Sequence, residues 1–207
     1  MVVIALPVVL VGCGDSDTPE SATTATTTSG PQLGPAFGSM DELPGILKTA
    51  PPWPENGEML QQRLRAIGLP ALSEEGQVVH IHQHLDLFVE GEKVEVPDDI
   101  GVGESFISPL HTHAQGDGVV HVESPTEVSY SLGQFFGVWG VRLDGRCIGA
   151  ACAGDGKQLR TWVNGEPVEG DPTRIVLAEH QEIVIAYGTP AQMPDPVPSS
   201  YEFPQGL

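Results

Sequence analysis

Apolar and polar residues alternate over residues 78–89, which predicts a β-strand with two different faces. Apart from Gln83, one face is apolar and carries Ile81, Leu85, Leu87 and Val89. The other face is polar and carries His80, His82, His84 and Asp86. Alternate residues of a strand point to the same side, and an apolar face needs a core to cover it. We therefore expect the histidines to point away from the core, into a cleft or into solvent.

A second alternating segment, residues 110–124, predicts a β-hairpin with Gln115-Gly116-Asp117-Gly118 as its turn. A hairpin symmetric about Asp117 has two opposed pairs on one face: His113 with His121, and His111 with Glu123. Directly opposed side chains have Cβ atoms about 4.5–5.5 Å apart. Two such imidazoles could share one ion at about 2.0–2.1 Å from each. A bulge in the loop would shift this pairing by one residue.

Six of the chain's seven histidines fall on these two segments, and all seven lie between His80 and His180. Imidazole is the commonest metal-binding side chain in proteins, and it binds zinc and copper in its neutral form. A lone histidine is more often a packed or hydrogen-bonded structural residue. Three on the polar face of one strand are not well explained in that way. The pattern therefore predicts a copper or zinc site built on strands.

One ion cannot use every histidine, because His80 and His84 are separated by about 13 Å along a strand that rises about 3.3 Å per residue. The preferred single site takes four imidazoles: His82, His111, His113 and His121. His80 and His84 are then flanking ligands or ligands of a second site. Glu123 and Asp86 are carboxylates that orient the imidazoles. His180 lies in a predicted turn and is expected to be structural or at the surface.

The remaining pattern predicts a mainly-β fold, a single small antiparallel β-sandwich or barrel-like domain with one or two short helices. A helix is expected at residues 57–67, with Asn56 as its N-cap. Residues 132–143 predict a turn of helix followed by a strand, and residues 183–187 predict another strand. The same tight hairpin with a glycine turn is predicted twice, at residues 88–94 and 162–168.

Length and composition suffice for one domain with a sizeable core, since the chain has 207 residues of which 40% are hydrophobic. We divide it into a signal peptide (1–12), a disordered Thr-, Ser-, Gly- and Pro-rich tether (13–52), the histidine-rich domain (53–188) and an extended, loosely held Pro-rich tail (189–207). The net charge of −19 argues against nucleic acid or anionic lipid as a partner, because both require a basic surface. It favours cations, and it is also common among exported proteins.

Residues 1–12 are almost all apolar and are followed by Cys13. A run of this length is too short to span a membrane but suits the core of a signal peptide. The Leu-Val-Gly-Cys ending resembles a bacterial lipobox, in which the cysteine is acylated and becomes the new N-terminus. The polar stretch after it is typical of a tether above a membrane. An ordinary cleaved signal peptide with an unrelated cysteine is the alternative.

The other two cysteines, Cys147 and Cys152, enclose a short glycine-containing loop. An even pair in an oxidising compartment predicts a local disulfide. A thiolate metal site is the alternative, but the chain has no further cysteine to complete it if Cys13 is lipidated.

Four segments within residues 53–188 carry a resemblance to a known family: HIHQHLDLFVEG, SPLHTH, GVVHVES and LGQFFGVWGVRL. They are similar to the corresponding segments of exported, often membrane-tethered domains of actinobacteria and related bacteria. The resemblance implies export and metal binding, and it names no reaction. The His-X-His strand is also similar to those of Cu,Zn superoxide dismutases, carbonic anhydrases and cupins, but the remaining spacing matches none of them.

These observations predict an exported lipoprotein at the outer face of the cell membrane that captures, buffers or transfers copper or zinc. Its expected partners are the metal ion and, through the lipid, the membrane. An extracellular mononuclear metalloenzyme, hydrolytic or oxidative, is the alternative, with Glu123 or Asp86 as general base. A structural or partner-binding domain whose histidines sense pH is the third. Metal binding is expected to weaken as pH falls through about 6.5, because protons compete for imidazole.

Overall fold

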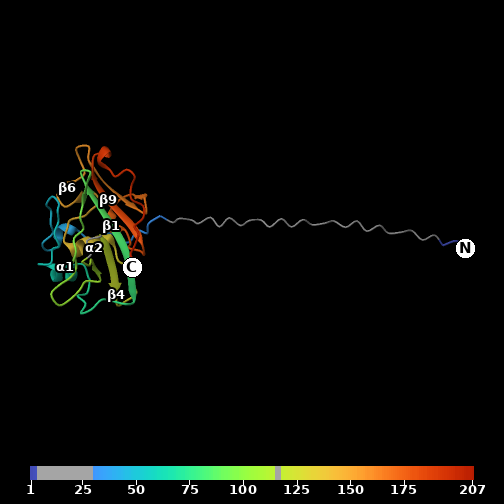
Figure 1. Ribbon diagram of the computed structural model, residues 1–207, viewed down its shortest axis with the longest axis horizontal. Helices are drawn as coiled ribbons and strands as arrows, with labels where there is room; N and C mark the ends of the chain where they lie inside the picture. The colour runs from blue at the N-terminus through green and yellow to red at the C-terminus, as the bar shows by residue number, and fades with distance from the viewer. Residues whose placement is uncertain (4–29, 115–117) are drawn as a thin grey trace.

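A mixed sheet of seven strands frames the domain, in the order β3-β4-β1-β9-β7-β8 with β2 paired to β1 (Figure 1). The computed structural model describes residues 1–3, 30–114 and 118–207. The strands of this sheet are β1 (Val79–Val89), β2 (Glu92–Val94), β3 (Leu110–His111), β4 (Val119–Ser124), β7 (Gln158–Val163), β8 (Glu166–Val168) and β9 (Gln181–Gly188). The mainly-β prediction is confirmed.

The two central strands, β1 and β9, run parallel, so the sheet is mixed rather than wholly antiparallel. Every other pairing within it is antiparallel among the described residues. A parallel pair needs a long crossover connection, and the chain between β1 and β9 supplies it. Hydrophobic alternation predicts which face of a strand is buried, but it carries no information on strand order.

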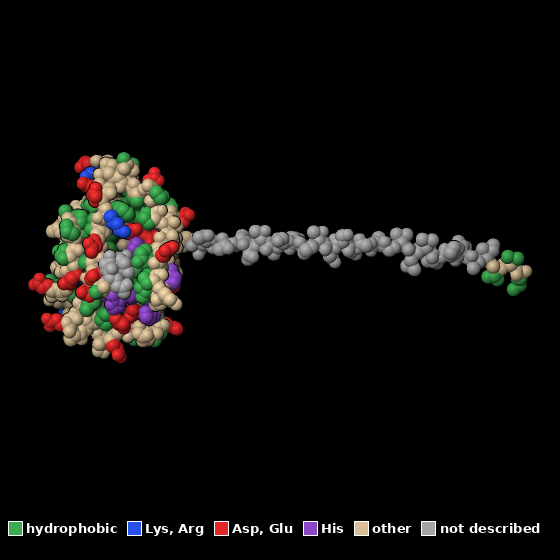
Figure 2. Space-filling model, in the orientation of Figure 1, with side chains coloured by type: hydrophobic (Ala, Val, Ile, Leu, Met, Phe, Trp, Pro, Cys, Tyr) green, Lys and Arg blue, Asp and Glu red, His purple; other side chains and the backbone are tan. Residues whose placement is uncertain are grey.

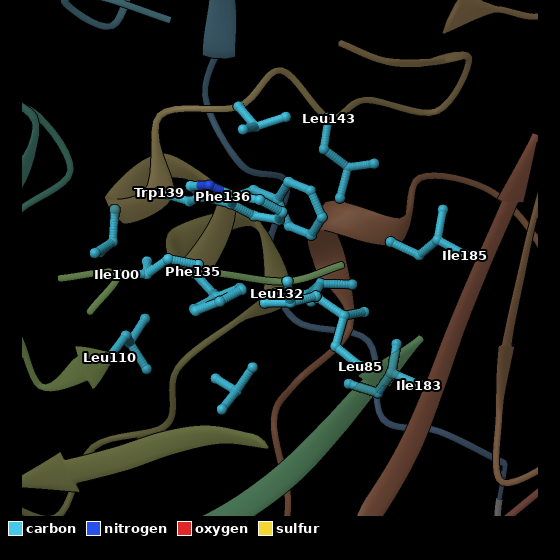
Figure 3. Close-up of a cluster of buried hydrophobic side chains, with 14 of the residues drawn as sticks. Leu85, Ile100, Leu110, Leu132, Phe135, Phe136, Trp139, Leu143, Ile183 and Ile185 are labelled. Atoms are coloured by element: carbon cyan, nitrogen blue, oxygen red, sulfur yellow. The ribbon is translucent and has the colours of Figure 1, made fainter. Parts of the chain in front are cut away.

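Helix α2 (Leu132–Trp139) packs its aromatic side chains against the apolar face of the sheet (Figure 3). Phe135 and Phe136 meet Leu85 of β1 and Ile183 of β9 in this core. Ser131 and Gln134 form a capping box at the start of the helix, and Gly140 ends it with a φ of 81°. The predicted single turn is thus a full helix. The strand expected after it is reduced to isolated bridges.

Helix α1 (Leu60–Ala66) is shorter than predicted, and Asn56 does not cap it. The Asn56 amide donates to the carbonyl of Gly45 instead. The fully buried Arg63 ties the two helices together, because its guanidinium donates to the backbone oxygens of Gly137 and Val138 at the end of α2. Burial lowers the pKa of Arg63 to about 10. The guanidinium therefore satisfies carbonyl groups that a helix end leaves without partners.

The two predicted glycine-turn hairpins are confirmed. β1 turns into β2 through Glu90-Gly91, and β7 turns into β8 through Asn164-Gly165. All four turn residues have positive φ, between 53° and 89°. This is the backbone of the type I′ turn, which matches the twist of paired strands.

The predicted disulfide is also confirmed. Cys147 and Cys152 are bonded across a separate two-stranded sheet, β5 (Cys147–Ile148) and β6 (Ala151–Cys152). Short 3-10 helices complete the elements: η1 (Met40–Glu42), η2 (Pro172–Arg174) and η3 (Pro190–Gln192). Within the described residues, no helix is long and apolar enough to cross a membrane.

Both segments that flank the domain differ from their predictions where they are described. Much of the expected tether lies outside the described residues, but from residue 30 onward it packs on the domain, with Leu33 bridged to Ile175 and Met40 buried. The C-terminal tail is irregular but not loose, because the ring of Tyr201 stacks on His84 with centroids 3.9 Å apart. Apolar and aromatic residues in these proline-rich segments supply the contacts.

Candidate metal centre

Strands β1, β4 and β3 lie side by side and bring three histidines into one row. His82 of β1 pairs with His121 of β4, which in turn pairs with His111 of β3. The next residue of β4 on the same face is Glu123, which pairs with His80. Directly paired residues point to the same face of a sheet. The polar faces predicted for the two segments therefore merge into one surface, opposite the face that carries the core.

The predicted register of the hairpin is wrong. His121 lies opposite His111 rather than His113. Strand β3 ends after His111, because the side chain of Thr112 accepts from the backbone N–H of Ile100 and donates to the carbonyl of Pro97. Of the turn predicted at residues 115–118, residues 115–117 lie outside the described residues. The shift is by two residues, so the histidines keep the face that was predicted for them.

Five imidazoles pack ring against ring on this surface, with His121 at the centre. Its ring centroid lies 4.6 Å from that of His82, 4.4 Å from that of His113 and 5.3 Å from that of His111. The fifth ring, that of His80, lies 4.9 Å from His82. Purple histidine side chains are seen at the surface on one side of the domain in Figure 2. The cluster is thus largely buried but reaches solvent at its edge, where His80 and His113 are partly exposed.

The donor atoms fall into two neighbouring groups that could each hold a metal ion. One is His111, His113, His121 and Glu123, and the other is His80, His82 and Glu123. Within each group the donor atoms lie within 4.8 Å of one another. Of the four histidines predicted to share one ion, three therefore come together. His82 belongs to the adjacent group, and Glu123 belongs to both.

The pair His111 and His113 has the spacing of two ligands on one ion. Their Nε2 atoms are 3.2 Å apart. Two nitrogens bound tetrahedrally at about 2.0–2.1 Å are separated by about 3.3 Å. The Nδ1–H of His111 donates to the carbonyl of Ser108 at 2.9 Å, which leaves the Nε2 lone pair directed into the group. Ser108 could not be predicted from the sequence, because any residue type has a backbone carbonyl that can accept this hydrogen bond.

Glu123 is a buried carboxylate surrounded by imidazole nitrogens. Its Oε1 lies 3.2 Å from His121 Nδ1 and 3.3 Å from His80 Nε2. Burial alone would raise the pKa of Glu123, but the hydrogen bond from His121 and the nearby His111 and His80 outweigh it and lower the pKa. The carboxylate is therefore ionised at neutral pH. It can orient the imidazoles, as predicted, or bind an ion itself.

His82 is the most unusual member of the cluster. Only 3% of its surface is exposed, and neither ring nitrogen has a hydrogen-bond partner among the described residues. Burial, followed by the charges of His121 and His80, lowers the pKa of His82 to about 4. Burial likewise lowers the pKa of His111 to about 4. Both rings are therefore neutral at pH 7, which is the form that binds metal.

His84 and Asp86 do not join this cluster. They lie further along β1 and form a separate group with Glu182 of β9, whose Oε2 is 2.7 Å from His84 Nδ1. Glu182 was not among the predicted site residues. Glu182 lies beside His84 because β1 pairs in parallel with β9. Alternation along a single strand cannot reveal which strands pair.

His180 lies outside all three donor groups, in keeping with its predicted structural role. Its ring contacts Glu179, the carbonyl of Leu207 and the ring of Phe203. Its backbone N–H donates to the carbonyl of His82 at 2.7 Å. Removal of the His180 side chain leaves that backbone bond in place, which makes it a useful control.

Fold and site together define a mainly-β domain whose buried histidines and carboxylates could hold a metal ion. No family model matches the chain, and neither a curated protein nor a solved structure matches it. The resemblance to exported actinobacterial domains therefore stays a prediction.

Proposed function

We propose that this protein is an extracytoplasmic lipoprotein that binds copper or zinc through its clustered histidines, for capture, buffering or transfer of the ion. The observation that carries the proposal is His82. A buried polar group without a hydrogen bond costs free energy, and an ion bound to a ring nitrogen of His82 would supply the missing partner. The adjacent imidazoles and Glu123 offer the other ligands and the compensating charge.

Three features favour a carrier over a single catalytic site. The two donor groups together hold five histidines and one carboxylate, which exceeds the four ligands of a typical structural zinc ion. Glu123 is common to both groups, so an ion bound to one already touches a ligand of the other. The partly exposed His80 and His113 offer points of entry and exit.

A mononuclear metalloenzyme is the second candidate, because the ionised Glu123 beside the imidazoles could act as a general base toward metal-bound water. The two candidates differ in coordination. A carrier is expected to fill the ion's coordination sphere with protein donors, whereas an enzyme keeps a position open for water. X-ray absorption spectroscopy of the loaded protein, with counting of nitrogen and oxygen neighbours and solvent exchange, separates them.

The metal content of the purified protein tests the proposal directly. After loading with copper or zinc and exhaustive dialysis, we expect a stoichiometric amount of metal per chain by elemental analysis. The matched control is the His82→Phe, His113→Phe double variant, which keeps ring-sized side chains but removes two imidazole ligands, one from each donor group. Wild-type protein that retains no more metal than this variant would contradict the proposal.

The lipid anchor is proposed on Cys13 and its lipobox-like context, and the disulfide between Cys147 and Cys152 is in keeping with an oxidising compartment. We expect the mature protein to fractionate with membranes. Cys13→Ser should release it or block its processing, while Cys13→Ala serves as a second variant of the same position. An unmodified, soluble N-terminus in the mass spectrum of the native protein would rule the anchor out.

A further inference from the structure

The group formed by His84, Asp86 and Glu182 has donor chemistry of a different kind from the imidazole cluster. It combines one imidazole with two carboxylates, and its donor atoms lie within 4.8 Å of one another. His84 Nδ1 is 2.7 Å from Glu182 Oε2, and His84 Nε2 is 4.0 Å from Asp86 Oδ1. All three residues are buried. The ring of Tyr201 stacks on His84 and holds the imidazole plane in place.

The charge of this group is only partly balanced within the fold, because the one ammonium group beside it belongs to the exposed Lys93. Glu182 is 1% exposed, and its Oε1 has no hydrogen-bond partner among the described residues. Asp86 is 6% exposed and lies in the same group. Two buried carboxylates so close together repel each other, and a buried charge without a partner is strongly unfavourable. A bound cation would satisfy both carboxylates at once.

We propose that His84, Asp86 and Glu182 form a second metal site, separate from the imidazole cluster, that takes a harder divalent cation of the Mn(II) class. Carboxylate oxygens suit Mg, Ca and Mn, and imidazole adds affinity for the transition metal among them. A copper or zinc ion finds more nitrogen donors at the imidazole cluster. The two sites therefore sort ions by ligand type.

His84 and Asp86, two members of the group, line a cavity large enough for an ion with bound water. The cavity has a volume of about 310 Å³, and its wall includes His84, Asp86, Lys93, Glu95 and Gly118. A water molecule takes up about 30 Å³ in the liquid. An ion with only three protein ligands could therefore complete its coordination with waters, as hard divalent cations commonly do.

The ammonium group of Lys93 lies beside Asp86, where the proposed cation would bind. Its Nζ lies 2.6 Å from Asp86 Oδ1, but its side chain is 62% exposed. A long, exposed side chain can leave an ion pair at little cost. We infer that Lys93 moves aside when the ion binds, so that the lysine competes with the metal and weakens its affinity.

The test is a titration of the full-length protein with Mn(II), in which electron paramagnetic resonance measures the free aqueous ion. Glu182→Gln and Asp86→Asn are each expected to weaken binding roughly tenfold or more. Lys93→Met is expected to tighten it about two- to fivefold, because the competing charge is gone. Glu179→Gln, an exposed carboxylate three residues from Glu182, is the control for loss of one negative charge and should leave binding unchanged.

Several outcomes overturn the proposal. It fails if Mn(II) does not bind at millimolar concentration, if Glu182→Gln binds as the Glu179→Gln control does, or if Lys93→Met does not tighten binding. Circular dichroism and thermal unfolding check that each variant is folded. If Glu182→Gln does not fold, Asp86→Asn and Lys93→Met still decide the question.

The second metal site and the proposed copper or zinc function can be tested independently of each other. His113→Ala removes a ligand of the imidazole cluster and should weaken Cu(II) or Zn(II) binding while Mn(II) binding stays the same. Glu182→Gln should do the reverse. Loss of copper and zinc binding alone counts against the carrier function, and loss of Mn(II) binding alone counts against the second site.

Discussion

Replacing His121 by alanine is expected to weaken Cu(II) or Zn(II) binding roughly a hundredfold or more, the largest effect of any single histidine. Its ring is the only one in contact with those of His82, His111 and His113 among the described residues. It also contacts Glu123, which belongs to both donor groups. Loss of His121 therefore disturbs both groups, whereas loss of His80 or His113 disturbs only one.

Competition with a chromophoric chelator measures the affinity of each variant. His180→Ala is the matched control, because it removes an imidazole that belongs to none of the donor groups. It is expected to change affinity by less than about twofold. His121→Gln, which retains a polar side chain, guards against a loss that reflects misfolding. Equal losses in His180→Ala and His121→Ala would disprove the site as described.

Acid is expected to destabilise the metal-free domain between pH 6.5 and about 4. An unfolded histidine has a pKa of about 6.5, whereas burial holds the pKa of His82 and of His111 at about 4 in the fold. As pH falls below 6.5, these two histidines become protonated in the unfolded chain but stay neutral in the folded chain. Stability that is fully present above pH 6.5 is therefore lost as pH falls toward about 4, at about 2–3 kcal/mol for each histidine by pH 4.5.

Urea unfolding of metal-free protein at pH 7.5 and pH 4.5 measures this loss. In His82→Gln, whose side chain does not titrate, the difference in unfolding free energy between the two pH values should shrink by the contribution of one histidine. The comparison with wild type cancels the carboxylates, which titrate in both proteins. An undiminished difference in the variant would show that His82 is protonated in the fold. Because both pKa values are low, protons compete with metal for these two imidazoles only at a pH well below 6.5, the value at which the sequence predicts weaker metal binding.

The sequence predicted the features of this molecule that depend on neighbouring residues. Alternation placed His80, His82 and His84 on one face of β1 and Leu85 on the other, because side chains of a strand alternate whatever the strand pairs with. The type I′ turns at Glu90-Gly91 and Asn164-Gly165 and the bond between Cys147 and Cys152 are equally local.

The features that it could not predict depend on distant contacts. The register of His111 with His121 is set by the attachment of Thr112 to residues 97–100. Glu182 joins His84 only because β9 lies parallel to β1. Asn56 donates to the carbonyl of Gly45 instead of capping α1. The pKa of His82 is lowered by burial and by the charges of His121 and His80, which reach it across the folded sheet. None of these partners can be read from alternation along one segment.

Topology also sets when each donor group can form during folding. The imidazole cluster draws on β1, β3 and β4, which are consecutive apart from β2 and lie within residues 79–124. The contact between His84 and Glu182 spans 98 residues and requires β9, the last strand of the sheet, to dock beside β1. Contacts distant in sequence carry the larger cost of loop closure and form late. The imidazole cluster could therefore bind copper or zinc while the chain is still folding and before its sheet is complete, whereas the pair of His84 with Glu182 exists only once β9 has docked beside β1.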